Sequence, residues 1–218
     1  MKDGARMAFI VVAALCAGAV HAHETGKSPA SAENVTIPRG KPDLAGPDAS
    51  AIEKRQRAYF TDTELLTQDG RKVRFYTDIL KDRLVVLNFI YTNCSDACPL
   101  ITAKLASARA QMNGLEDKGL RLVSISIDPV RDTPQALAAF AGKFDARRDD
   151  WVFLTGTKRN IDTILKKLGA YTEEVGSHNT AIIAGNLRND HWRRIRPETP
   201  DNVIAETVRY LADPDNLR

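Results

Sequence analysis

The sequence predicts an α/β fold in which helices flank a central sheet, and three observations lead to this prediction. Residues 84–91 and 120–127 are nearly continuous apolar runs with many β-branched residues, as in strands that are buried on both faces. A segment with the apolar spacing of a helix follows each run. The segment from about Ala51 to Arg218 contains about 170 residues, enough for one domain with a sizeable core.

The first expected element is a β-hairpin that precedes the buried strands. Strand-like runs at residues 63–66 and 72–75 flank the turn Gln68-Asp69-Gly70. An Asp-Gly pair between two such runs is typical of a hairpin. A short helical turn at 78–81 is expected to lead into the first buried strand at 84–91.

Helices and strands alternate in the rest of the chain. Pro99 suits a first helical turn, Thr133 and Pro134 suit an N-cap and the position after it, and Gly169 is placed to end a helix. This order predicts a thioredoxin-like central sheet flanked by helices, with an N-terminal β-hairpin extension. The expected elements are helices at 99–113, from 134 onward, at 160–168 and at 203–211, and strands at 120–127, 151–154, 179–184 and 192–195.

The N-terminal segment has the features of a secretory signal. Lys2 and Arg6 give it a positive start, an apolar run follows, and Val20-His21-Ala22 is a small-residue cleavage site. The run is shorter than the roughly 20 residues of a membrane-spanning helix, so a retained anchor is the less favoured interpretation. We therefore expect a cleaved signal peptide over residues 1–22, a flexible leader over 23–50 and a folded domain over 51–218.

Charge and compartment narrow the class of function. The formal net charge is +3, and cleavage after Ala22 lowers it to +2, because two basic residues and one acidic residue leave. This near-neutral balance gives no support to nucleic acid as a partner. We expect a monomer in a bacterial periplasm or a similar oxidising space, where a pair of cysteines can persist as a disulfide.

Two cysteines, Cys94 and Cys98, carry the chemistry that the sequence reveals. They are the only cysteines left after removal of the signal, and they follow a buried strand at the start of a helix, one helical turn apart. The free N–H groups and dipole of a helix N-terminus favour a thiolate, which both thiol exchange and metal binding require. A purely structural disulfide is less favoured, because so short a loop would contribute only about 2 kcal/mol.

A soft cation such as Cu(I) would suit two thiolates, with imidazole as a third ligand. Outside the signal the chain has three histidines, His23, His178 and His191. In a thioredoxin-like sheet, the loop with His178 precedes a late strand and faces the loop after the first buried strand, so His178 could reach both sulfurs. We expect His23 in a solvated tail and His191 at the surface. Zinc is less favoured, because structural zinc sites usually have four protein ligands.

These residues resemble the Sco/SenC family of copper-binding, thioredoxin-like assembly factors. The match covers about Phe60 to Leu211, and its motifs are specific only in combination. The residues that carry it are Gln68-Asp69-Gly70, Cys94-Ser95-Asp96-Ala97-Cys98-Pro99, Ser124-Ile125-Ser126-Ile127-Asp128-Pro129, Arg131-Asp132-Thr133-Pro134 and His178.

The resemblance implies a metal site and a partner. It implies copper, as Cu(I) or Cu(II), held by Cys94, Cys98 and His178. Members typically help to assemble the dinuclear copper centre of cytochrome c oxidase subunit II, as copper donors, as reductants of the target cysteines, or as both; another copper enzyme is an alternative target. The chain has Ser95 and Ser177 where the family commonly has Pro and Asp. Neither change removes a ligand, but Ser177 alters the surroundings that orient the imidazole.

A thiol–disulfide oxidoreductase that uses Cys94 and Cys98 without copper is the alternative. Thioredoxin-type enzymes more often have two residues between their cysteines and a cis-proline in the facing loop. This chain has three residues between them and His178 in that loop, which favours copper. A thiol peroxidase is a third hypothesis, but no separate peroxidatic-cysteine motif is visible.

Several other features have plain structural interpretations. Asp128 and Asp132 are expected to shape the turn and the helix start near the cysteines. The basic residues within 193–196 could dock an acidic partner, although a solvated strand face is the commoner interpretation. Both tryptophans, Trp151 and Trp192, are expected to be packing residues.

Overall fold

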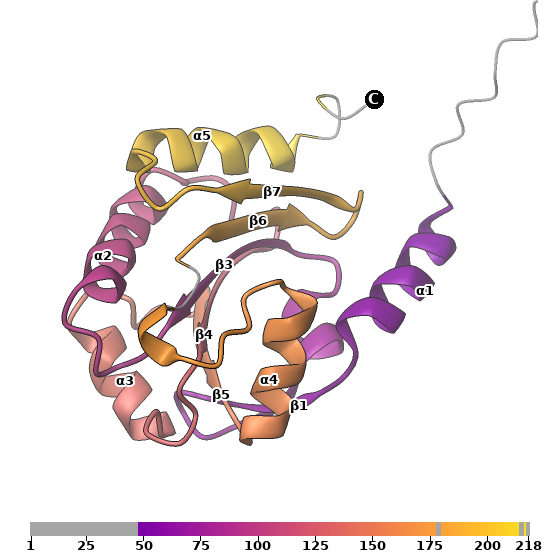
Figure 1. Ribbon diagram of the computed structural model, residues 1–218. Helices are drawn as coiled ribbons and strands as arrows, with labels where there is room; N and C mark the ends of the chain where they lie inside the picture. The colour runs from indigo at the N-terminus through magenta and orange to yellow at the C-terminus, as the bar shows by residue number, and fades with distance from the viewer. Residues whose placement is uncertain (1–47, 178–179, 214–215, 217–218) are drawn as a thin grey trace, which may run out of the picture. The chain divides into compact units, whose positions relative to one another are not determined.

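A single mixed sheet forms the centre of the protein in the computed structural model, which describes residues 48–177, 180–213 and 216 (Figure 1). Within these residues the sheet has seven strands in the order β2-β1-β5-β4-β3-β6-β7. The middle three run parallel, β6 and β7 are antiparallel to their neighbours, and β1 and β2 form the predicted hairpin. The strands are β1 (Glu64–Thr67), β2 (Lys72–Arg74), β3 (Leu84–Ile90), β4 (Leu120–Ser126), β5 (Trp151–Thr155), β6 (Ile182–Asn186) and β7 (His191–Ile195).

Helices cover both faces of the sheet, which confirms the predicted α/β architecture. One face packs against α2 (Ala97–Ala110), α3 (Pro134–Gly142) and α5 (Asp201–Ala212). The other face packs against α4 (Lys158–Lys167), the π-helical turn η1 (Phe75–Leu80) and the end of α1 (Ala49–Phe60). Figure 1 shows α4 in front of the sheet and α5 along its β7 side.

The central strand β3 explains why the sheet has two apolar layers. All seven of its residues are buried. Leu84, Val86 and Ile90 face the α2 layer, whereas Val85 and Leu87 face the α4 layer. This alternation follows from the two-residue period of a strand. The chain leaves the C-terminal end of β3 and enters α2 through the loop that contains Cys94.

Several element boundaries differ from the sequence prediction, such as that of β6, which was expected at 179–184, and one helix was not expected. The helix expected to begin at Pro99 begins at Ala97, so Cys98 lies within its first turn. Helix α1 was not expected, because it begins inside the predicted leader and buries only Ile52, Gln56 and Phe60. Such sparse burial leaves little apolar periodicity for a sequence pattern to show.

The local signals for turns and caps are confirmed. The Thr133 hydroxyl accepts a hydrogen bond from the backbone N–H of Ala136 at 3.2 Å, as an N-cap should. Gly70 and Gly169 have φ of 75° and 64°, the left-handed conformation that favours glycine in a hairpin turn and after a helix. Among the described residues, no helix is long and apolar enough to cross a membrane.

Candidate metal and thiol site

The two cysteines lie where β3 passes into α2. Cys94 is in the connecting loop with 8% of its surface exposed, whereas Cys98 is fully buried in the first turn of α2. The backbone N–H of Cys98 points at the Cys94 sulfur, with a nitrogen–sulfur distance of 3.4 Å. The pair is therefore more buried than an open exchange site, and only Cys94 reaches the surface.

The environment of Cys94 favours a thiolate. Burial by itself raises the pKa of this thiol, but hydrogen bonds to its sulfur from the backbone N–H groups of Cys98 and Asp96 oppose that effect. The side chains of Cys98 and Tyr91 also donate to it, and the net result is a lowered pKa. This agrees with the expectation that a helix N-terminus stabilises a sulfur anion.

Cys98 behaves in the opposite way. Burial is the largest cause, and it raises the pKa of Cys98 to about 12. The hydrogen bond and the negative charge of Cys94, together with the charge of Asp132, add to the rise. The physical reason is the early start of α2, which places this side chain inside the apolar layer instead of at the exposed helix end. In the reduced site Cys94 therefore loses its proton more readily than Cys98 does.

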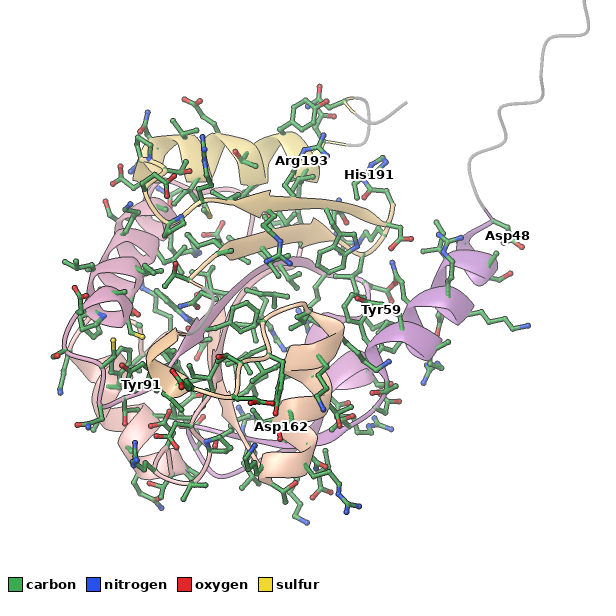
Figure 2. The ribbon with its side chains drawn as sticks, viewed as in Figure 1. Asp48, Tyr59, Tyr91, Asp162, His191 and Arg193 are labelled. Carbon is green, nitrogen blue, oxygen red and sulfur yellow. The ribbon has the colours of Figure 1, made fainter. Side chains whose placement is uncertain are left out.

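Tyr91 is a site residue that the sequence analysis missed. Its pKa is raised, chiefly by its hydrogen bond to Cys94 and next by burial. A hydroxyl that donates to a sulfur loses that bond when it ionises, so Tyr91 stays protonated and stabilises the thiolate. Figure 2 labels Tyr91 just after the end of β3. Its position between the strand and the first cysteine was the only available signal.

A buried carboxylate supports the loop from below, as expected for a turn-shaping residue. Asp132 is 1% exposed and accepts hydrogen bonds from the Thr92 backbone N–H at 3.0 Å, the Thr92 hydroxyl at 2.6 Å and the Ser126 hydroxyl at 2.6 Å. Asp128 begins the same turn and pairs with Arg131 at 2.9 Å. The end of β4 is thereby fixed to the loop that leads to Cys94.

His178, the third predicted ligand, lies outside the described residues. In the part of the chain that the structure describes, no group of three or more His, Cys, Asp or Glu residues could hold a metal. The register of β6 is nevertheless informative, because Ile183 pairs with Leu87 and β6 therefore begins beside the end of β3. The turn η2 (Val175–Ser177) precedes it, and Val175 and Tyr91 pack against the same apolar cluster.

His191, which was expected at the surface, lies far from the two cysteines. His191 pairs with Asn186, which in turn pairs with Leu84 at the opposite end of β3 from Cys94. It is partly buried, less exposed than expected, and its Nδ1 has no hydrogen-bond partner within the described structure. His23 lies outside the described residues.

The donors around Cys94 suit a soft metal ion as well as thiol exchange. One sulfur is already favoured as an anion, and a second lies one helical turn away, which is the donor type that Cu(I) prefers. Binding a cation through both sulfurs would release the Cys98 proton, because metal ligands must be deprotonated. The same asymmetry suits exchange, with a slightly exposed sulfur at Cys94 to attack and a fully buried sulfur at Cys98 to resolve the mixed disulfide.

Comparison with known proteins agrees with this geometry. The SCO1/SenC family model matches residues 53–217. A SCO1 protein homolog of Bacillus subtilis is 29% identical over 150 residues, which span 68% of this chain and 65% of that protein. A putative copper-binding protein of Stutzerimonas stutzeri is 30% identical over 168 residues, 68% of this chain and 79% of that protein. The match thus spans slightly less than two thirds of the Bacillus relative.

A solved structure gives the same result for the fold. The structure of BsSco, described as a member of the Sco family of cytochrome c oxidase assembly proteins with a disulfide switch, superposes with a TM-score of 0.58. It is 26% identical and the alignment covers 68% of this chain and 90% of that one. The predicted thioredoxin-like sheet is confirmed by the strand order and by this likeness together.

Proposed function

This chain belongs to the SCO1/SenC family, and from that premise we propose that it is a copper-binding chaperone for the assembly of cytochrome c oxidase. The observation that carries the proposal is the Cys94 thiol, whose pKa is lowered at the start of α2 beside a second, buried thiol. Copper would be the cargo of this site. The name of the Stutzerimonas relative supports copper as the metal, and the description of BsSco supports a role in cytochrome c oxidase assembly.

The proposed ligands are Cys94, Cys98 and His178. Cys94 would bind first because its thiolate is favoured and because it alone of the two reaches the surface. Cys98 would then lose its proton to become the second ligand. The imidazole of His178 would complete the set, since the strand that follows it begins beside the end of β3.

Transfer would proceed by ligand exchange at the exposed side of the site. A partner thiolate would approach Cys94, because the other sulfur lies under α2. The proposed recipient is the dinuclear copper centre of cytochrome c oxidase subunit II or of another copper enzyme. The signal predicted at residues 1–22 supports action in the periplasm, and N-terminal sequencing of the exported protein would test it.

A thiol–disulfide reductase activity is a second candidate, favoured by the unequal thiol pKa values. The Cys94 thiolate would attack a disulfide of the target, forming a mixed disulfide and releasing one target thiolate. Cys98, once deprotonated, would attack the Cys94 sulfur and release the second target thiolate. Two electrons pass to the target, which becomes a dithiol, and this chain ends with a Cys94–Cys98 disulfide.

Copper stoichiometry under anaerobic conditions separates the two functions. The reduced protein would be loaded with Cu(I), freed of excess metal and assayed for bound copper. We expect one copper per chain in the wild type and in His191→Ala, which removes a histidine at the other end of the sheet. We expect strong loss in His178→Ala and in Cys94→Ser.

The same variants would be tested for reduction of a disulfide substrate. Retained reductase activity in His178→Ala with lost copper would show that the histidine serves the metal alone. Absence of retained copper in the wild type, with reductase activity that is independent of His178, would overturn the chaperone proposal. Equal copper binding in the wild type and His178→Ala would remove the histidine from the ligand set.

A further inference from the structure

A cavity of about 440 Å³ opens on the α4 side of the sheet, remote from the cysteines. It lies where α1, the end of α4 and the strands β6 and β7 meet, and none of its lining residues belongs to the Cys94–Cys98 segment. Figure 2 labels Tyr59, which lines the cavity from α1. Its volume is in the range of small-molecule sites, roughly 300–1,000 Å³.

The floor of the cavity is apolar and partly aromatic. The Phe60 and Trp192 rings have centroids 5.3 Å apart and are tilted by 40°, and Leu168 and Ile183 complete the surface. Gly185 lies directly opposite Trp192 in the strand register. A Cβ atom at Gly185 would come within 2.1 Å of the indole, so the missing side chain allows the indole to lie across β6.

The rim of the cavity is cationic. Arg194 lies on the same face of β7 as Trp192 and donates to the Leu168 carbonyl at 3.1 Å. The Lys167 ammonium lies 5.4 Å from the centre of the Tyr59 ring. Within the described residues, neither of these two cations forms an ion pair with a carboxylate. A guanidinium has five N–H donors, so Arg194 keeps donors for a further partner.

Among the described residues, Asp190 is the one carboxylate that lines the cavity, and it already has its partners. Asp190 pairs with Arg55 at 2.7 Å, accepts a hydrogen bond from Gln56 at 3.0 Å and accepts one from the Trp192 indole at 3.3 Å. It therefore balances Arg55, and among the described residues Lys167 and Arg194 have no carboxylate partner. Capping of the α4 C-terminus accounts for one bond of Arg194, but it does not account for Lys167.

We propose that this cavity binds a small aromatic carboxylate. The aromatic body would lie on Phe60 and Trp192, where burial of apolar surface favours it. The carboxylate would meet Arg194, whose planar fork matches it with two parallel hydrogen bonds. This activity goes beyond the copper chemistry proposed above and shares no residue with it.

The test uses 2-naphthoate as the probe and 2-naphthamide as an uncharged ligand of the same shape, titrated calorimetrically into the full protein. We expect 2-naphthoate to bind and the amide to bind at least about tenfold more weakly, because only the carboxylate gains charge-assisted hydrogen bonds. Quenching of tryptophan emission gives a second readout, since Trp192 lines the cavity whereas Trp151 is 1% exposed in the other apolar layer.

Two arginines of neighbouring sequence make a matched comparison. Arg194→Gln should weaken 2-naphthoate about tenfold and leave the amide unchanged. Arg196→Gln removes the same charge outside the cavity, where that arginine pairs with Glu198 at 3.3 Å, and it should change neither ligand. Gly185→Ala should abolish binding of both ligands by displacing the indole. Lys167→Gln serves in place of Arg194→Gln if loss of the α4 contact prevents folding.

Three results would overturn the proposal: no binding of 2-naphthoate at millimolar concentration, equal affinity for acid and amide, or equal affinity in the Arg194→Gln and Arg196→Gln variants. Copper stoichiometry measured on the same proteins keeps the two proposals separate, because Arg194→Gln should retain its copper and His178→Ala should retain its 2-naphthoate binding.

Discussion

The thiol site and the aromatic cavity lie on different faces of the same sheet and are built in different ways. The thiol site is assembled by neighbouring residues, from Tyr91 to Cys98, and is held by the buried Asp132. The cavity draws its walls from α1, α4, β6 and β7, which are far apart in the sequence. The first site is small and nearly closed, whereas the second is open and lined by cations.

This difference shows what each site can do. Burial keeps Cys98 protonated and leaves Cys94 as the single reactive sulfur, so the thiol site is specified by local electrostatics. In the cavity, burial raises the pKa of Asp190, but its hydrogen bonds from Arg55, Gln56 and Trp192 outweigh burial and leave that pKa lowered. The selectivity of the cavity would come from shape and charge.

The largest expected effect concerns the two thiols. Cys98 has a pKa of about 12. At pH 8 its thiolate fraction is on the order of 10⁻⁴, whereas the lowered pKa of Cys94 gives that sulfur a larger thiolate fraction than an ordinary cysteine has at the same pH. We expect iodoacetamide to modify Cys94 about a thousandfold faster than Cys98, as measured by mass spectrometry of peptides after timed reaction.

The two cysteines should also differ in how their alkylation rates depend on pH. Raising the pH from 5 should accelerate Cys94 alkylation with a midpoint below the ordinary thiol pKa of about 8.5, because the pKa of this thiol is lowered. Cys98 should stay unreactive across this range in the wild type and in Cys94→Ser, since its burial does not depend on its neighbour. Comparable labelling of both cysteines would contradict the asymmetric site.

The next effect concerns the carboxylate beneath the thiol loop. Asp132→Ala leaves the Thr92 N–H, the partly buried Thr92 hydroxyl and the buried Ser126 hydroxyl without their acceptor. We expect the free energy of unfolding to fall by about 2–4 kcal/mol, measured by urea denaturation of the reduced protein. Binding of 2-naphthoate should not change in the fraction that remains folded, because the cavity lies on the other face.

Asp128→Ala is the matched control for that change. The Asp128 carboxylate lies in the same turn as Asp132, but its ion-pair partner Arg131 is exposed. We therefore expect the free energy of unfolding to fall by only about 1 kcal/mol. If both variants lost the same stability, the supporting role assigned to Asp132 would be wrong.

The contrast between the sites also explains what the sequence could predict. The strands, the Gln68-Asp69-Gly70 hairpin and the Thr133 cap depend on near neighbours, so their patterns were readable and the structure confirms them. The pKa of Cys98 was not readable, because it depends on where α2 begins and on residues that bury the side chain from elsewhere. The cavity was not readable either, since Arg194 and Trp192 gain their roles only when α1 and α4 pack beside β7.

The smallest expected effect comes from removing a helix cap on either face of the sheet, and it tests whether a change on one face affects the site on the other. Thr133 and Thr157 cap α3 and α4, each accepting a backbone hydrogen bond at 3.2 Å, and the two helices lie on opposite faces. Replacing either by Ala should cost about 1 kcal/mol of unfolding free energy. Because Thr133 follows Asp132, its loss should also slightly change Cys94 alkylation, whereas Thr157→Ala should leave that rate unchanged. If Thr157→Ala altered the thiol as much as Thr133→Ala did, the two faces would be coupled through the sheet, and the separation of the sites would fail.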